Sequence, residues 1–443
     1  MKVIDFYPYN WEEEWGLLSK MDQINALLKW GCERNKNETI LKIEQEYLYW
    51  TKVKHYANKF ELSEKIFWAL IKKMRSEHRI AIFILANRDY MTYSVDEIVQ
   101  KKLYIIDDLV MQILSEKESD MDDLLEAYYQ DGLIEESIAT SQFEGAKTKR
   151  SVAKDMLYSG RQPKDFHEKM IVNVYKASKE LLLSPNKMSV DSFVKLHNQL
   201  IVNTKQTLQA DDFNLRTDGV EIEKNNKVVF KPISDSRQIQ DSVNILLLWI
   251  NNEIQFSHFI HPVIKAIVIH YWIAYIHPFY DGNGRTARMM FYWFISQHKQ
   301  YEILKYIPIS TTISKSRKGY EDAFLFVEHD EHDLNYFIHY HLDIIQKSLI
   351  HFKEHLAESQ KSLKIAAQNL ASYKLNWRQI RLIQHAQRHP DTRYTIRAHQ
   401  EINKINRITA TKDLETLVSH GFFSETKLSK IRLFAFKSAM PPS

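Results

Sequence analysis

The chain has 443 residues, of which 44% are hydrophobic and 12% aromatic, and this composition excludes a largely disordered protein. The length exceeds one ordinary core, so we expect two or three domains. The net charge of +4 gives the whole chain no strong electrostatic preference for nucleic acid or a membrane surface. The single cysteine, Cys32, cannot form an internal disulfide, and the N-terminus lacks the apolar stretch of a signal peptide. These features predict a cytoplasmic protein.

Residues 1–123 are predicted to form an N-terminal helical region. Apolar residues recur at helical spacing in "ELSEKIFWALIKKM" and in "KKLYIIDDLVMQILSEK". The whole chain has ten glycines and ten prolines, so few positions interrupt a helix. We therefore expect a mainly α protein.

The next stretch with helical spacing is "DLLEAYYQDGLIEESIATSQFEG". Its last residues can be interpreted either as an ordinary helix end or as a functional motif. Gly145 is placed as a glycine that ends a helix. Glu144 alone is typical of a solvated helix residue. The string "TSQFEG", which begins at Thr140, indicates a function only when it occurs together with a second motif later in the chain.

One segment breaks the helical pattern. Residues 216–233, "RTDGVEIEKNNKVVFKPI", alternate apolar and polar residues on both sides of "EKNNK". Asn225 and Asn226 tolerate a tight turn, so the pattern predicts a β-hairpin. It is either a surface decoration or a functional flap.

The most membrane-like stretch is "HPVIKAIVIHYWIAYIHPFY", which begins at His261. Lys265, His270 and His277 interrupt it, so we expect a buried helix rather than a membrane span. The glycine-rich string "HPFYDGNGRT" closes this helix, and another helix follows at once.

This helix–loop–helix has the properties of an anion site. Gly282, Asn283 and Gly284 allow a tight turn with exposed amides, and the following helix offers free N–H groups and a positive dipole end. Arg285 and Arg288 are three residues apart, so they share a helix face. Their guanidinium groups suit phosphate.

Two further side chains add chemistry to the loop. Asp281 could hold Mg²⁺, which prefers one or two carboxylates together with phosphate oxygens. His277 has the unperturbed pKa of a general base. The loop thus predicts a polyphosphate–Mg²⁺ site with a base beside it, and it is not a Walker loop.

The string "HPFYDGNGRTAR" resembles the signature of the Fic family, HxFx[DE]GNGRxxR, at every defined position. The resemblance covers residues 124–342 and implies a Fic-type helical core with the hairpin as its flap. It implies transfer of AMP from ATP to a Ser, Thr or Tyr hydroxyl of a protein. A homodimer is common among relatives of this kind.

The resemblance also implies roles for individual residues. His277 would deprotonate the target hydroxyl, and Asp281 would bind Mg²⁺. The ATP-binding set would be Gly282, Asn283 and Gly284 as the anion hole, Arg285 on the phosphates and Arg288 on the γ-phosphate. The flap residues Val228, Val229 and Phe230 would align the target segment by strand addition.

The earlier string "TSQFEG" matches the family's inhibitory signature [ST]xxxE[GN] at Thr140, Glu144 and Gly145. The resemblance implies that Glu144 pairs with Arg288 and blocks productive ATP binding. Because the motif lies within the same chain, this inhibition would be internal.

Residues 343–374 are predicted as a helical connector, and residues 375–443 as a winged helix-turn-helix. Between Asn376 and Lys437 twelve lysines and arginines face five acidic residues, a local net charge of +7. DNA binding and protein interaction through this domain both stay open.

Three alternatives compete with an AMP transferase. The same site could remove AMP, with Glu144 positioning water, or it could use another nucleotide donor. In a different class, the chain could be a DNA-binding regulator whose core senses nucleotide, although a sensor needs no base such as His277. The expected partners are ATP, an unidentified target protein, the chain itself as a target, and DNA.

Overall fold

The computed structural model describes residues 10–34, 36–77, 79–84, 90–115, 122–181, 187–204, 213–224, 227–254, 258–428 and 431–437. The chain divides into two compact units. One consists of residues 1–107, 256–271 and 316–346, and the other of residues 108–255, 272–315 and 347–443. Both units are therefore discontinuous in sequence, and the predicted boundaries at residues 123, 342 and 374 stay predictions.

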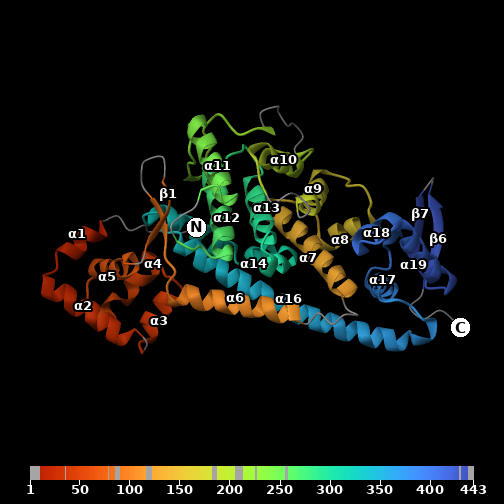
Figure 1. The fold of residues 1–443 in the computed structure, drawn as a ribbon, viewed down its shortest axis with the longest axis horizontal. Coiled ribbons are helices and arrows are strands. Elements are labelled where there is room, and N and C mark those ends of the chain that lie inside the picture. The colour runs from red at the N-terminus through yellow and green to blue at the C-terminus, as the bar shows by residue number, and fades with distance from the viewer. Residues whose placement is uncertain are drawn as a thin grey trace. The chain divides into compact units, whose positions relative to one another are not determined.

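The first unit contains the N-terminal helices, a small sheet and parts of three helices that also belong to the second unit (Figure 1). Its elements are α1 Trp11–Gly16, α2 Lys20–Glu33, α3 Glu38–Gln45, α4 Trp50–Val53, η1 Lys54–Phe60, α5 Glu64–Ser76, β1 Ile80–Ile84, β2 Tyr90–Tyr93 and α15 Arg317–His329. The shared helices are α6 Glu97–Ser115, α12 Pro262–Ile276 and α16 Asn335–Asn369. The antiparallel pair β1–β2 was not predicted; its run of β-branched and aromatic residues favours a strand over a helix.

Buried charges connect the N-terminal helices of this unit to its segment 330–336. The Lys72 ammonium is fully buried and lies 2.6 Å from the Asp330 carboxylate. Arg79 pairs with Asp333 at 3.2 Å, and the Tyr47 hydroxyl donates to the same carboxylate at 2.7 Å. Because a buried charge without a partner is costly, this network fixes how these segments pack within the unit.

The second unit holds the glycine loop. Its further elements are α7 Asp122–Phe143, α8 Arg150–Ser159, α9 Phe166–Leu181, α10 Val190–Ile201, β3 Ile222–Lys224, β4 Lys227–Phe230, α11 Ser236–Ile250, α13 Asn283–Ser296, η3 Lys299–Tyr306 and α14 Ile309–Lys315. Helix α7 packs against α8, α9, α13 and α14, as Figure 1 shows. Ile134, Ile138, Met156 and Ile171 lie in the apolar core between α7, α8 and α9.

The helices on either side of the loop are buried on every side. The apolar residues of α12 from Val263 to Ile273 are at most 2% exposed, so the membrane-like stretch is a core helix, as predicted. Helix α13 buries twelve of its fourteen residues, including Arg285 and Arg288. A loop between two such helices has little freedom to move. In the described residues, no helix is both long and apolar enough to cross a membrane.

The predicted hairpin is confirmed. Strands β3 and β4 pair antiparallel, with Glu223 opposite Val228 and Ile222 opposite Phe230. The predicted turn residues, Asn225 and Asn226, lie outside the described residues. Within the described part of the chain this sheet has only these two strands.

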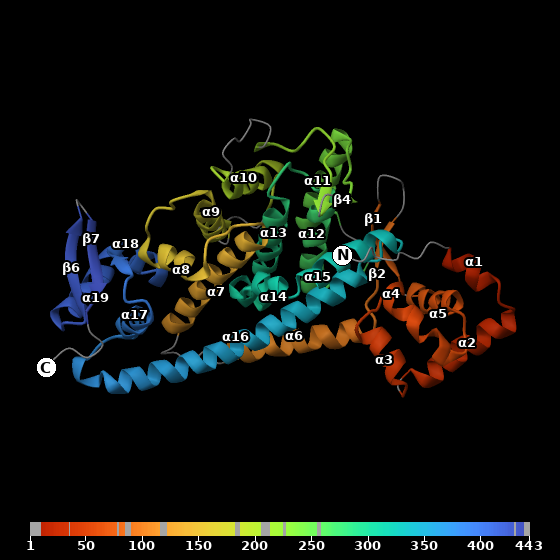
Figure 2. The same ribbon diagram turned by 180° about the vertical axis from the view of Figure 1, so that it is seen from behind.

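The C-terminal elements include three helices and a three-stranded sheet, and the winged helix-turn-helix stays a prediction. They are η4 Ala371–Tyr373, α17 Trp377–Arg388, β5 Arg393–Thr395, α18 Ile396–Asn403, α19 Arg407–Ser419, β6 Phe423–Leu428 and β7 Ile431–Phe436. The sheet order is β5-β7-β6, and Figure 2 shows the β6–β7 hairpin beside α19. The short strand β5 was not predicted, because its three residues are too few to show an alternating pattern.

Candidate active site

The glycine loop is closed on itself by one side chain. The Asn283 amide donates to the Phe279 carbonyl at 2.6 Å and accepts from the Phe279 N–H at 2.9 Å. Gly282 has φ +80°, a left-handed conformation in which a side chain would also clash with Ile201. Helix α13 begins directly after it, so the loop presents its amides at a helix N-terminus, as predicted.

His277 sits in a left-handed conformation, with φ 52°. A non-glycine residue pays about 1 kcal/mol for this, so the surrounding structure must hold it. Arg216 supplies the constraint: its Nε donates to the His277 carbonyl at 2.6 Å and its Nη2 to the Ile276 carbonyl at 3.1 Å. The guanidinium is 1% exposed and also donates to the carbonyls of Asp218 and Ile233, at the two ends of the hairpin.

The imidazole of His277 is arranged as a base. Its Nδ1 lies 3.2 Å from the Ala274 carbonyl, which can only accept, so Nδ1 carries the proton and Nε2 keeps its lone pair. Burial lowers the pKa of His277, despite the opposing hydrogen bond to Ala274. The ring is therefore neutral at pH 7, the state that can accept a proton.

Asp281 and the first arginine of the motif lie together at the loop. The Nη2 of Arg285 lies 3.6 Å from the Asp281 carboxylate. The Nη1 of Arg285 donates to the Leu200 carbonyl at 2.9 Å. The Asp281 side chain is 35% exposed, so it can reach a ligand. Among the described residues, no cluster of three or more His, Cys, Asp or Glu could hold a metal ion. One accessible carboxylate beside an anion site fits Mg²⁺ that arrives with phosphate oxygens, and it does not fit a protein-only metal cage.

The inhibitory string reaches the loop from α7. The Arg288 Nη2 donates to the Glu144 carboxylate at 2.6 Å, and its Nε donates to the Thr140 hydroxyl at 2.5 Å. The Arg288 side chain is 3% exposed, so this charge is desolvated as well as paired. Gly145, with φ +98°, follows the end of α7 as predicted. The two motifs, far apart in sequence, therefore meet as an ion pair.

Gly284 explains how close this pair comes to the loop. A Cβ built on Gly284 would lie 2.3 Å from the Glu144 carboxylate oxygen and 3.2 Å from an Arg288 nitrogen. A glycine at position 284 is thus needed for the Glu144 carboxylate to approach the loop closely, as well as for the turn of the backbone. The Glu144 carboxylate occupies space directly against the amide-presenting turn.

A second acid on the same face of α7 was not predicted. Glu136 lies eight residues before Glu144 and is 2% exposed. Its carboxylate accepts from the Ser310 N–H at 2.8 Å and from the Ser310 hydroxyl, at the start of α14. Burial raises the pKa of Glu136 to about 7, although these hydrogen bonds and the charge of Arg288 oppose the shift. Glu136 anchors α7 upstream of the pair with Arg288.

Two more residues that the sequence reasoning missed contact the loop or the hairpin. Arg216 stood in the quoted hairpin string, but nothing in its local sequence shows that it binds four carbonyls. His197 of α10 lies against the loop, where burial lowers its pKa to about 4. The isolated histidine in "KLHNQ" gives no signal of its own, because only the packing of α10 brings it to the loop.

The hairpin is attached to the loop at its base. The Tyr280 hydroxyl accepts from the Thr217 N–H at 3.3 Å, and the Phe230 ring lies 5.5 Å from that of Tyr275. Val228 is 41% exposed and Val229 is partly exposed. The structure thus places the three predicted flap residues on a strand held beside the site.

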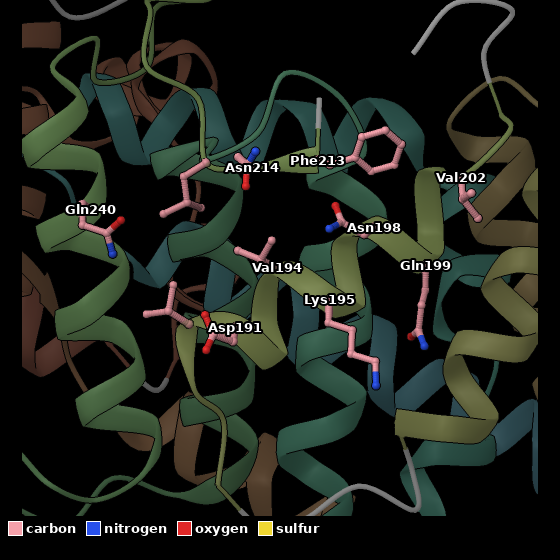
Figure 3. A pocket seen from close by; sticks show the side chains of 11 residues that line it. Asp191, Val194, Lys195, Asn198, Gln199, Val202, Phe213, Asn214 and Gln240 are labelled. Carbon is pink, nitrogen blue, oxygen red and sulfur yellow. The ribbon is translucent and has the colours of Figure 1, made fainter. Parts of the chain in front are cut away.

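A groove of about 690 Å³ lies along α10 and is bordered by residues 213–215 and Gln240 of α11 (Figure 3). It is lined by Val190, Asp191, Val194, Lys195, Asn198, Gln199, Val202, Phe213, Asn214, Leu215 and Gln240. Only Asp191 and Lys195 among these are ionisable, and they form no cluster suited to catalysis. This groove therefore adds no catalytic group to those of the loop.

Comparison with known proteins agrees with this geometry. Residues 187–295 match the sequence profile of the Fic/DOC family. The chain is 28% identical over 105 residues to protein adenylyltransferase fic-1 of Caenorhabditis elegans, covering 24% of this chain and 18% of that protein. It is 50% identical over 42 residues to protein adenylyltransferase Fic of Drosophila willistoni, covering 10% and 8%. The matched part thus spans less than a fifth of these relatives.

Two solved structures share the fold. A Fic family protein from Desulfovibrio desulfuricans superposes with a TM-score of 0.51 at 15% identity, covering 78% of this chain and 97% of that one. A fragment of Fic-1 from C. elegans superposes with a TM-score of 0.50 at 18% identity, covering 79% and 92%. At these identities the likeness establishes the fold.

The raised pKa of Glu136 predicts a pH dependence of stability. Its pKa is about 7 in the folded chain and 4.5 in the unfolded chain, so its contribution is fully present below pH 4.5 and is lost as the pH rises through 7. The shift corresponds to about 3 kcal/mol. We expect Glu136→Gln, which stays neutral, to gain melting temperature over wild type between pH 5 and pH 8.

The matched control is Glu358→Gln, at an exposed position of α16. Its melting curve should follow wild type at both pH values. Parallel pH curves for Glu136→Gln and wild type would show that Glu136 is already ionised in the fold.

Proposed function

Residues 187–295 form a domain of the Fic/DOC family, and from this premise we propose that the chain transfers AMP from ATP to a Ser, Thr or Tyr hydroxyl of a protein. The observation that carries the proposal is the neutral, Nδ1-protonated His277 beside a loop whose amides and arginines suit phosphate. An anion sensor would need the loop and not the base.

The reaction uses the site as follows. The target hydroxyl oxygen attacks the α-phosphorus of ATP, and His277 Nε2 takes the hydroxyl proton. The bond from the α-phosphorus to the bridging oxygen breaks, and pyrophosphate leaves with the electron pair. The amides of Gly282, Asn283 and Gly284 and the guanidinium of Arg285 stabilise the charge on the phosphates. Positioning supplies most of the rate, as is usual for such transfers.

Asp281 would hold the Mg²⁺ that accompanies the phosphates, and the ion would neutralise charge as pyrophosphate forms. The exposure of the Asp281 carboxylate supports this assignment. The partly exposed strand β4 supports alignment of a target segment by strand addition, with Val228 and Val229 on its accessible part.

We propose that Glu144 inhibits this transfer. Arg288 is the candidate ligand for the γ-phosphate, and it is now engaged by Glu144 and Thr140. A carboxylate pressed against Gly284 also repels an incoming phosphate. Because Glu144 directly follows the end of α7 and its side chain is partly exposed, movement of one side chain could relieve the inhibition.

The first test concerns the base. In the Glu144→Gly background, His277→Ala should reduce transfer by about 10²–10⁴-fold, the usual contribution of a general base, while ATP binding measured by calorimetry changes little. The phosphate contacts come from other residues, so binding should survive. A variant that keeps more than about half of the parental rate shows that His277 is not the base.

The second test separates inhibition from simple destabilisation. Glu144→Gly should raise self-labelling by [α-³²P]ATP well above wild type, because it frees Arg288. Arg288→Ala should stay low, because it removes a phosphate ligand, and the double variant should resemble Arg288→Ala. Thermal melting on all four proteins confirms folding. If folded Glu144→Gly labels no faster than wild type, the inhibitory role is wrong; faster loss of AMP from a labelled target in wild type than in Glu144→Gly would favour AMP removal.

A second candidate role, DNA binding, belongs to residues 375–443, which we predict to form a winged helix-turn-helix. Lys412 and Ile408 are exposed on α19, the candidate recognition helix. Two other cations are already paired: Arg378 with Asp413 at 2.7 Å, and Arg432 with Glu415 at 2.8 Å. The local charge of +7 thus overstates the cations available for phosphate.

If the domain binds DNA, the affinity of the full chain for duplex DNA should fall steeply with salt, with a log–log slope of about −0.9 per phosphate contact. Lys412→Ala should make the slope shallower by about one unit. The control Lys187→Ala changes an exposed lysine on the approach to α10 and should leave the slope unchanged. Absence of binding at about 50 mM salt favours the protein-interaction alternative.

A further inference from the structure

We infer that His197 is a positioning residue for the transfer reaction, because it holds the phosphate-binding loop from behind through a hydrogen bond to Asp281. This inference rests on the proposed function for its kinetic consequence. The contact itself is independent of that function. His197 does not touch the reacting atoms.

Two contacts join His197 to the loop. Its Nε2 lies 2.8 Å from the Asp281 carbonyl oxygen, and because a carbonyl only accepts, Nε2 carries the proton and donates. Its ring stacks on Phe279, with centroids 3.6 Å apart and planes 1° from parallel. The imidazole therefore fixes the loop at two points, the residues immediately before and immediately after Tyr280.

The position of this imidazole bears on two functional parts of the loop. Asp281 carries the candidate Mg²⁺ ligand, and its own carbonyl is the acceptor. A Cβ on Gly282 would lie 3.3 Å from the His197 Nε2, so the histidine also packs closely against the left-handed turn. Fixing this carbonyl limits rotation of the Asp281–Gly282 peptide, and that rotation would redirect both the carboxylate and the first exposed amides.

The simplest alternative is an ordinary packed histidine, which His197 resembles in being fully buried. His341 provides the comparison within the same chain. It is 1% exposed, its Nδ1 donates to the Phe337 carbonyl at 3.0 Å, and its ring lies 3.9 Å from that of Phe337. The two histidines share burial, a carbonyl acceptor and an aromatic neighbour, but His341 is bonded within its own helix and does not contact the loop.

Two substitutions separate the hydrogen bond from the packing. His197→Phe keeps an aromatic ring against Phe279 and removes the donor. His197→Gln places an amide nitrogen near the position of Nε2, so it keeps the donor and loses the ring. A positioning role predicts that Gln restores function and Phe does not. A packing role predicts the reverse order.

The experiment measures transfer kinetics and hydrogen exchange in the Glu144→Gly background, with His341→Phe as the matched control. We expect His197→Phe to lower kcat by about 10- to 100-fold, the usual cost of small misplacement, with the KM for ATP within about threefold of the parent. His197→Gln should stay within about threefold in kcat. His341→Phe should keep the parental kcat even where its melting temperature falls.

Hydrogen exchange gives a readout that needs no activity. The amides of Phe279 and Thr286 are bonded inside the loop, to the Asn283 side chain and the Gly282 carbonyl. Their exchange should be faster in His197→Phe than in the parent, His197→Gln or His341→Phe. Unchanged exchange, or kinetics of folded His197→Phe within about twofold of the parent, overturns the inference. If the parent transfers no AMP, the proposed function fails and the exchange result still decides the role of His197.

Discussion

The candidate site depends on one buried cation that, among the described residues, hydrogen-bonds to carbonyls and to no carboxylate. Arg216 donates to four backbone carbonyls, two at the end of α12 and two at the ends of the hairpin. Carbonyls at a helix C-terminus lack partners within the helix, so a guanidinium there satisfies groups that would otherwise be buried and unpaired. The same bonds hold His277 in its left-handed conformation. One side chain thus sets the position of the candidate base relative to the strand that would present the target.

Two side chains hold the loop, and a glycine leaves its third side open to close approach. Asn283 closes it from within, His197 supports it from α10, and Gly284 leaves room for groups that approach from α7. Because α12 and α13 are buried on all sides, these contacts need no further rearrangement to form an anion site. Such a rigid, amide-lined turn suits reactions that depend on stabilising charge at a fixed position.

Three polar residues lie along α7 and at its C-terminal end, and they have two partners between them. Glu136 binds the start of α14, Thr140 binds Arg288 from the side, and Glu144 pairs with the same guanidinium. Spacing by four residues puts them in a row along the helix. Glu136 is buried and Glu144 is partly exposed, so the helix is fixed upstream and accessible where it meets the loop. Exposure thus rises from Glu136 to Glu144. This is the arrangement expected for an inhibitory segment whose last residue must be able to separate from Arg288.

The sequence by itself determined the helical class, the hairpin and the residues of the glycine loop, because periodicity, turn chemistry and a dense motif are local signals. It also supplied both members of the Glu144–Arg288 pair, but only through the resemblance of two separate strings to family motifs. The tertiary structure alone decided the parts played by Arg216, His197 and Glu136. Each is a single polar residue without a motif around it, and each has at least one backbone partner that lies more than fifteen residues away in sequence. Every residue has a backbone carbonyl, so the sequence does not show which carbonyl is a partner. Only the packing of the chain could reveal these contacts.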